Sequence, residues 1–290
     1  MSLTFPTTTQ KKPSGLTALP NQVKRPAFGT LHGFDAQGGA SAICTNDYYI
    51  DLSEVGDRIS CGDPSWRTAS EPANLTVSSW VNADAFANNR RFVQLGNSTT
   101  SGKTIGFGLA AHSGSVFRGF YRPTTTKSQE VVVKSSALST GTWYHVCFTY
   151  ASDGTAVLYI DGSADTTADS TYGYDSAFGC NDLEFGRKPC HNNWAHTFLG
   201  KLDEVAIWTS VLGASEVAEI AVKDGSNPGA PCLDSDHGDY SSSSDLVGWW
   251  RMGDGTENGS GDTIYDMSSN SNNGTIVDHD DDDSITIEEY

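Results

Sequence analysis

The sequence predicts an all-β protein folded as a two-sheet antiparallel sandwich, with an extended N-terminal arm and one short helix. Two observations indicate this class. Short runs in which apolar and polar residues alternate recur from residue 41 onward, separated by clusters of Gly, Ser, Asn and Asp. The hydrophobic share is 37%, which suits half-buried strands joined by turns better than packed helices.

Residues 1–40 are predicted to form the extended arm. Proline recurs among Thr, Gln and Lys, and no hydrophobic period of 2 or 3.6 is present. We expect this arm to dock on a partner subunit, and a disordered tail is the alternative. The positive charges available for docking are Lys11, Lys12, Lys24 and Arg25.

The strongest strand signals lie in the middle of the chain. Residues 141–150 and 156–162 alternate on either side of Asp153-Gly154, which predicts a hairpin. Further strands are predicted at 48–50, 57–60, 74–81, 91–96, 104–109, 116–121, 130–133, 183–186, 200–208 and 246–252. Residues 213–223 alone are predicted to be helical, with Ser215 as the N-cap.

These elements divide the chain into four parts. The arm at 1–40 is followed by the sandwich at 41–224. The segment 225–277 is expected to close the same sandwich, because about 50 residues with one good strand pair bury little core alone. Residues 278–290 are predicted to be an acidic tail.

Charge and composition exclude several classes of protein. The net charge of −18 disfavours nucleic acid as a partner. No apolar run approaches the roughly 18 residues that would predict a membrane span. The first residues do not resemble a secretory signal, so we expect the six cysteines to be reduced thiols. The absence of a Cys-x-x-Cys pair argues against a structural zinc site.

Four motifs occur together in a characteristic order. They are Trp-Tyr-His-Val at 143–146, Tyr-Ile-Asp-Gly at 159–162, Gly-Lys-Leu-Asp-Glu-Val-Ala-Ile-Trp at 200–208 and a short helix from Leu212. With Thr-Val-Ser-Ser-Trp-Val at 76–81, they resemble the laminin-G-like, concanavalin A-like lectin and glucanase superfamily. The resemblance covers roughly residues 45–223 and implies a jelly-roll sandwich.

A second resemblance concerns the order of the parts. The Trp249-Trp250 segment follows the domain here, and chains with this order are similar to structural proteins of tailed bacteriophages. This implies a non-catalytic virion protein at the virion surface, made in the host cytoplasm: a capsid decoration, head-fibre or tail-adhesin subunit in a homo-oligomeric assembly. Its partners would be other virion subunits, through the arm, and glycans of the host surface, with no membrane contact. A free carbohydrate-binding module is the alternative, and a glycoside hydrolase on the same fold is the third hypothesis.

No catalytic residue is predicted. Glycoside hydrolases need two carboxylates across a scissile bond. Asp182 and Glu184 share a face but open a structural strand, and Asp203 and Glu204 are expected to point to opposite faces of a regular strand. His145, two residues from Cys147, is expected to be a structural histidine rather than half of a Cys/His pair.

Two kinds of binding residue are predicted. Loop aromatics, amides and Arg can bind sugar rings and hydroxyls, although such residues also anchor loops. The candidates are Tyr172, Tyr174, Arg187, Asn192, Asn193 and Trp194. The resemblance implies a structural Ca²⁺ near Asp203. Asp266, Ser268, Asn270 and Asn272 place oxygen ligands at alternate positions, which calcium favours, although these residue types also build turns.

Overall fold

The computed structural model describes residues 46–67, 74–96, 106–122, 130–168, 181–189, 196–252, 259–260, 262–278 and 285–290. The predicted arm at 1–40 lies outside these residues. Among the described residues, no helix is long and apolar enough to cross a membrane.

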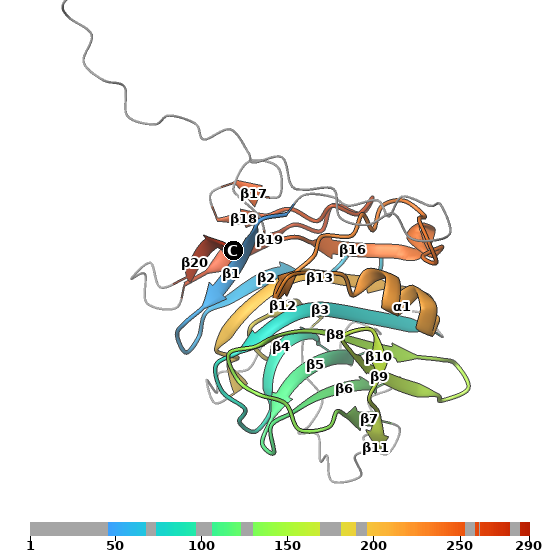
Figure 1. Cartoon of the computed structure of the whole chain (residues 1–290). Coiled ribbons are helices and arrows are strands. Elements are labelled where there is room, and N and C mark those ends of the chain that lie inside the picture. The colour runs from blue at the N-terminus through green and yellow to red at the C-terminus, as the bar shows by residue number, and fades with distance from the viewer. Residues whose placement is uncertain are drawn as a thin grey trace, which may run out of the picture. The chain divides into compact units, whose positions relative to one another are not determined.

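Two large antiparallel sheets form the sandwich, as the alternating pattern predicted (Figure 1). The first sheet runs in the order β10-β9-β8-β3-β13-β1-β20, and β16 also pairs with β13. Its strands are β1 (Tyr48–Leu52), β3 (Leu75–Ala83), β8 (Trp143–Tyr150), β9 (Ala156–Ile160), β10 (Ser163–Ala164), β13 (Gly200–Trp208), β16 (Leu246–Trp250) and β20 (Ile285–Glu289).

The second sheet runs in the order β11-β7-β6-β5-β4-β12-β2-β19-β18-β17. Its strands are β2 (Arg58–Gly62), β4 (Arg90–Leu95), β5 (Gly106–His112), β6 (Val116–Arg122), β7 (Val131–Lys134), β11 (Thr167–Ala168), β12 (Leu183–Phe185), β17 (Gly259–Ser260), β18 (Thr263–Ile264) and β19 (Gly274–Val277). The segment after the helix therefore contributes strands to both sheets.

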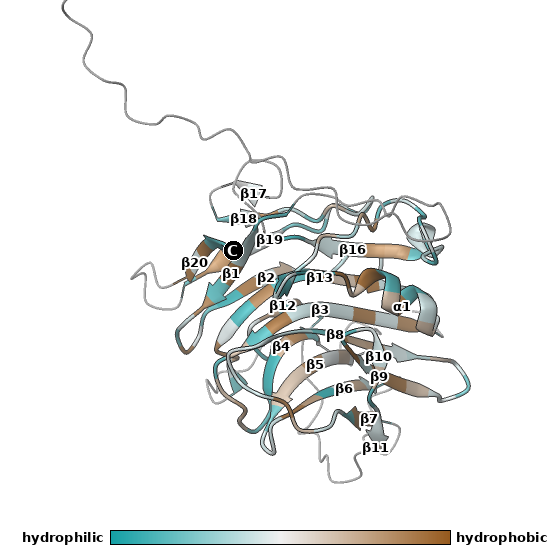
Figure 2. Ribbon diagram, in the orientation of Figure 1, coloured by the Kyte–Doolittle hydropathy of each residue, from teal (hydrophilic) through white to brown (hydrophobic). Residues whose placement is uncertain are grey.

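The main core lies between the two sheets. On β3, Leu75, Val77 and Val81 point inward and are fully buried, while Thr76, Ser78 and Trp80 point to the outer face of the first sheet. Figure 2 shows apolar and polar residues alternating in this way along several strands. The sheets approach closely where Gly119 on β6 meets the ring of Phe148 on β8, because a Cβ at Gly119 would overlap that ring.

The outer face of the first sheet is partly covered by the segment that follows β13. Helix α1 (Ala214–Ile220) buries Val217 and Ile220 against Trp208, in a cluster completed by residues of the segment up to β16. The predicted N-cap at Ser215 is wrong. The cap is Gly213, whose backbone N–H donates to the Glu216 carboxylate at 2.9 Å, so this glutamate replaces a side-chain cap.

Beyond the helix, a small hairpin formed by β14 (Lys223–Asp224) and β15 (Asn227–Pro228) lies against β8. A short 3₁₀ helix (Ser243–Asp245) then leads into β16.

The acidic tail predicted at 278–290 contains a strand. Residues 285–289 form β20, which pairs with β1 along its whole length. Ile285 and Ile287 alternate with polar residues and pack against the main core, which the high density of acidic residues had masked.

Candidate functional site

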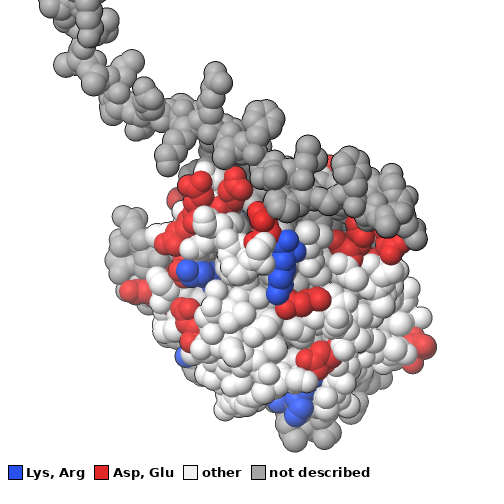
Figure 3. Space-filling view, viewed as in Figure 1, with Lys and Arg blue, Asp and Glu red and all other residues white. Residues whose placement is uncertain are grey.

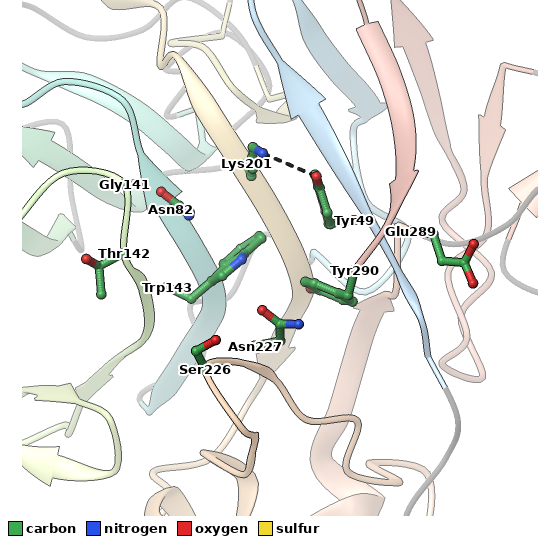
Figure 4. Close-up of a pocket in the computed structure, with 10 residues that line it drawn as sticks. All are labelled: Tyr49, Asn82, Gly141, Thr142, Trp143, Lys201, Ser226, Asn227, Glu289 and Tyr290. Carbon is green, nitrogen blue, oxygen red and sulfur yellow. Dashed lines mark hydrogen bonds between the residues drawn. The ribbon is translucent and has the colours of Figure 1, made fainter. Parts of the chain in front are cut away.

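A pocket of about 450 Å³ opens on the outer face of the first sheet, within the size range of small-ligand sites. Strands β1, β3, β8, β13 and β20 supply its floor, and the β14–β15 hairpin supplies one wall (Figure 4). The described residues that line it are Tyr49, Asn82, Gly141, Thr142, Trp143, Lys201, Ser226, Asn227, Glu289 and Tyr290.

Strand register assembles the floor of this pocket. Trp143 on β8 lies opposite Asn82 on β3, and Asn82 lies opposite Lys201 on β13. Residues that are directly opposite in adjacent strands point to the same face of a sheet. Three residues far apart in sequence therefore form one cross-strand row that presents a ring, an amide and an ammonium to the pocket.

Three aromatic rings converge at one end of the row. The ring of Tyr49 lies 5.6 Å from that of Trp143 and 5.0 Å from that of Tyr290, and Trp143 and Tyr290 are 5.7 Å apart. Figure 4 shows these rings turned toward one another, whereas Glu289 points away from them. Tyr49 and Trp143 are 7% and 8% exposed, so the rings pack mainly against one another, with Tyr290 half-buried beside them. Aromatic rings beside polar groups are an arrangement suited to sugar rings.

Hydrogen bonds and charges fix the polar edge of the pocket. The Lys201 ammonium donates to the Tyr49 hydroxyl at 3.2 Å, and that hydroxyl donates to Glu288 at 2.6 Å. Partial burial lowers the pKa of Lys201, but the hydrogen bond to Tyr49 and the carboxylates of Asp51 and Glu288 raise it by more, so the net shift is upward. Lys201 is therefore a positioned cationic donor.

Asp203 and Glu204 lie together beneath this site, which corrects the prediction that they point to opposite faces. The Asn46 amide donates to both carboxylates, at 3.0 Å each. The cause is a β-bulge in β13 between Asp203 and Ala206, where Glu204 adopts a φ of 47°. A bulge adds a residue to one strand and breaks the regular alternation. It occurs where the partner of β13 changes from β1 to β16.

The chain's own donors occupy this carboxylate pair. Glu204 accepts from Trp249 Nε1 at 2.5 Å and from Arg251 Nε at 2.9 Å. Asp203 accepts from the Tyr290 hydroxyl at 2.8 Å. Burial and the neighbouring Glu204 raise the pKa of Asp203 well above its ordinary value. The pair therefore anchors one pocket aromatic, Tyr290, to the bulge.

At both predicted calcium sites the carboxylate oxygens already accept hydrogen bonds from the chain, unlike those of an open cation site. Asp266 accepts backbone N–H groups from Trp249, Ser268 and Asn272 at 2.8–2.9 Å. The side chain of Asn270 donates to a backbone carbonyl at 3.1 Å. No group of three His, Cys, Asp or Glu residues within the described ranges is arranged to hold a metal. Calcium at Asp203 or Asp266 would have to displace these donors. Calcium binding at either residue stays a prediction.

Most of the predicted sugar-binding residues and the arm's charges fall outside the described ranges. These are Tyr172, Tyr174, Asn192, Asn193 and Trp194, together with Lys11, Lys12, Lys24 and Arg25. Arg187 is described: it is buried, and its Nε lies 3.2 Å from Glu184, with which it forms an ion pair. The pocket lining does not include Arg187.

Other predicted residues lie outside the described lining of the pocket. Glu184 pairs with Arg58 and Arg187, which places it in a buried charge cluster of the second sheet. His145 and Cys147 share the outer face of the first sheet, and burial raises the pKa of the Cys147 thiol. The expectation of reduced thiols is wrong for Cys232, which is disulfide-bonded.

The pocket residues were missed because their strands were interpreted only for their inward faces. The outward positions of β1, β3 and β8 carry Tyr49, Trp80 and Trp143, although the inward positions already supply the core. Large aromatics on the outward face of a strand indicate a second contact surface, and this signal was present in the sequence.

Comparisons with known proteins agree with this architecture. The model of the concanavalin A-like lectin/glucanases superfamily matches residues 54–218. A structure of a candidate carbohydrate-binding protein from Bacteroides ovatus is 18% identical with a TM-score of 0.55, and the alignment covers 85% of this chain and 60% of that one. At this identity the likeness shows the fold alone. A search of curated proteins gave no match.

Two further structures show a weaker likeness. A heptameric SAP-like pentraxin from Limulus polyphemus is 16% identical with a TM-score of 0.46, over 64% of this chain and 87% of the pentraxin. The CBM40 domain of a Ruminococcus gnavus sialidase, bound to α2,3-sialyllactose, is 15% identical with a TM-score of 0.46, over 62% of this chain and 100% of that domain.

Proposed function

Since the chain belongs to the concanavalin A-like lectin/glucanases superfamily, we propose that it is a non-catalytic carbohydrate-binding domain whose site is the pocket on the first sheet. The observation that carries the proposal is the convergence of Tyr49, Trp143 and Tyr290 beside the polar side chains of Asn82 and Lys201. The rings would stack on a sugar, and the amide and ammonium would bind its hydroxyls.

The arrangement of carboxylates supports binding rather than hydrolysis. Hydrolysis of a glycosidic bond uses two carboxylates that flank the bond, about 5–9.5 Å apart. Glu289 is the one carboxylate among the described residues of the pocket lining, and it points away from the rings (Figure 4). The buried Asp203–Glu204 pair is occupied by hydrogen bonds from the chain itself.

Surface charge favours an uncharged glycan over a polyanionic one. Acidic side chains outnumber basic ones over the face shown in Figure 3, in keeping with the net charge of −18. A sulfated or phosphorylated glycan would meet repulsion from this surface.

A glycan array with three variants tests the proposal. Trp143→Ala is expected to abolish binding, whereas Tyr265→Ala, which removes an aromatic ring outside the pocket, should leave it intact. Unchanged binding by Trp143→Ala with loss in Trp194→Ala would move the site to the loop predicted from sequence. Release of reducing sugar from any polysaccharide would favour the hydrolase instead.

The setting that we propose for this domain is a virion surface. Its support is the sequence resemblance to phage structural proteins and the disulfide at Cys232, which suits a protein that works outside a reducing cytosol. The arm would dock the domain on other virion subunits. Deletion of residues 1–34 should then prevent incorporation into particles without changing the folding of the sandwich. A truncated chain that is still incorporated would favour the free binding module.

A further inference from the structure

Two buried polar groups lie next to the pocket without hydrogen-bond partners. Trp80 on β3 and His145 on β8 are directly opposite each other, with ring centroids 5.3 Å apart. Their exposed fractions are 0% and 2%. Neither Trp80 Nε1 nor His145 Nδ1 has a partner. Buried polar atoms are almost always hydrogen-bonded, so this adjacent pair calls for an explanation.

The two groups have complementary chemistry. The indole Nε1–H of Trp80 can only donate a hydrogen bond. Burial lowers the pKa of His145 to about 4, so its ring is neutral near pH 7 and one ring nitrogen can accept. A single hydroxyl can accept from Trp80 and donate to His145, and this would satisfy both groups.

The position of the pair continues the pocket along the sheet. Trp80 and His145 come two residues from Asn82 and Trp143 on the same strands and point to the same face. Two residues along a strand correspond to about 7 Å. This step is comparable to the length of one sugar residue in an extended chain.

The β14–β15 hairpin covers this part of the face. The Lys223 ammonium lies 5.7 Å from the centroid of the Trp80 ring, and β15 lies against β8. On the described residues, one ion pair ties the hairpin to the sheet, from Lys223 to Asp161 at 2.7 Å, and about a third of each side chain is exposed. Exposed ion pairs stabilise little, and two-stranded hairpins are marginal alone. Few polar contacts therefore hold the hairpin down, and lifting it would expose the buried Pro228 and the ring of Trp80.

We propose that the pocket continues beneath this hairpin into a second sugar subsite, where Trp80 and His145 bind one hydroxyl of the adjoining residue once the hairpin has lifted. The inference rests on the proposed function, because it makes the ligand an oligosaccharide rather than a single sugar. Ser226 and Asn227 of the hairpin line the first pocket, so a bound ligand would contact the cover directly.

The first experiment tests the cover without any ligand. Hydrogen exchange of the Trp80 indole N–H is measured by NMR in the full chain, in Lys223→Met and in the control Lys134→Met, whose lysine lies on β7 of the other sheet. We expect at least tenfold faster exchange in Lys223→Met and no change in the control. Equal rates in all three proteins would show that Lys223 does not hold the hairpin over Trp80. An internal water bonded to both would then account for the two unpartnered atoms, Trp80 Nε1 and His145 Nδ1.

The second experiment tests the subsite. Affinities for glucose and cellotetraose, N-acetylglucosamine and chitotetraose, and mannose and mannotetraose are measured by calorimetry in the full chain, Trp80→Phe and His145→Phe. We expect a tetramer to bind at least tenfold more tightly than its monomer, and both variants to reduce this advantage to less than threefold. Thermal unfolding checks that each variant is folded, and the two variants remove different partners of the same hydroxyl.

The outcomes separate the two proposals. An undiminished tetramer advantage in both variants, with binding still lost in Trp143→Ala, would overturn the second subsite and leave the pocket. Equal affinities for monomer and tetramer would do the same. If no saccharide of this panel or of the array binds, the proposed function fails, and the ligand class of the subsite fails with it.

Discussion

The neutral, buried His145 should make the stability of the sandwich depend on pH. Burial lowers the pKa of this side chain from 6.5 to about 4; the Asp161 carboxylate opposes that effect, and Lys223 adds to it. The unfolded chain therefore binds a proton near pH 6.5, before the folded chain does. The contribution of His145 to stability is complete above pH 6.5 and is lost as the pH falls toward 4.

The size of the effect follows from the shift. One pKa unit corresponds to about 1.4 kcal/mol, so the full loss is about 3 kcal/mol, of which about 2 kcal/mol has occurred by pH 5. Asp203 acts in the opposite sense. Because its folded pKa is raised, its contribution is present below the ordinary value of 3.8 and is lost as the pH rises through the folded value.

Urea unfolding of the wild type and of His145→Phe at pH 8 and pH 5 isolates the histidine, because Asp203 and all other groups are common to both proteins. We expect the wild type to lose about 2 kcal/mol more than the variant between these pH values. A difference below about 0.5 kcal/mol, or an NMR titration of His145 with a midpoint near 6.5, would refute the reasoning.

Three other results are expected from the structure. Glu204→Ala removes the carboxylate that accepts from the buried Arg251 guanidinium at 2.9 Å, and it should lower the free energy of unfolding by about 3–5 kcal/mol in urea titrations. A loss below about 1 kcal/mol would contradict this. Gly119→Ala should lower the free energy of unfolding by about 1–3 kcal/mol, because its Cβ would overlap the ring of Phe148 between the sheets. The change would be measured as a lower melting temperature. An unchanged melting temperature would show that the sheets can separate freely. If calcium binds at Asp203 or Asp266, millimolar calcium should raise the melting temperature, and no rise would remove both sites.

Local pattern was sufficient to predict the fold but not the site. Alternation along 74–81 and 141–150 identifies which residues face the core, and the Asp153-Gly154 turn identifies two strands as neighbours. The row of Trp143, Asn82 and Lys201 depends on the register between strands whose paired residues are about 60 and about 120 residues apart in sequence. No local pattern specifies that register, because it is set by packing across the whole sheet.

The bulge in β13 shows a second limit of pattern analysis. Regular alternation predicted that Asp203 and Glu204 point apart, and this is valid only for an uninterrupted strand. The irregularity arises where β1 ends its pairing with β13 and β16 begins. Both of those partners lie outside the motif that made β13 recognisable. The deviation is therefore a tertiary effect imposed on a segment whose own sequence is regular.

The pocket is lined partly by the family-matched region and partly by segments outside it. The family model matches residues 54–218, and this part supplies Asn82, Trp143 and Lys201. Gly141 and Thr142 also fall within it, and the other lining residues come from outside it: Tyr49, Ser226 and Asn227 of the β14–β15 hairpin, Glu289 and Tyr290. The family-matched region thus provides most of the floor, while segments outside it provide two of the three rings and one wall. Under the proposed function, ligand specificity should depend on those segments as well as on the matched floor.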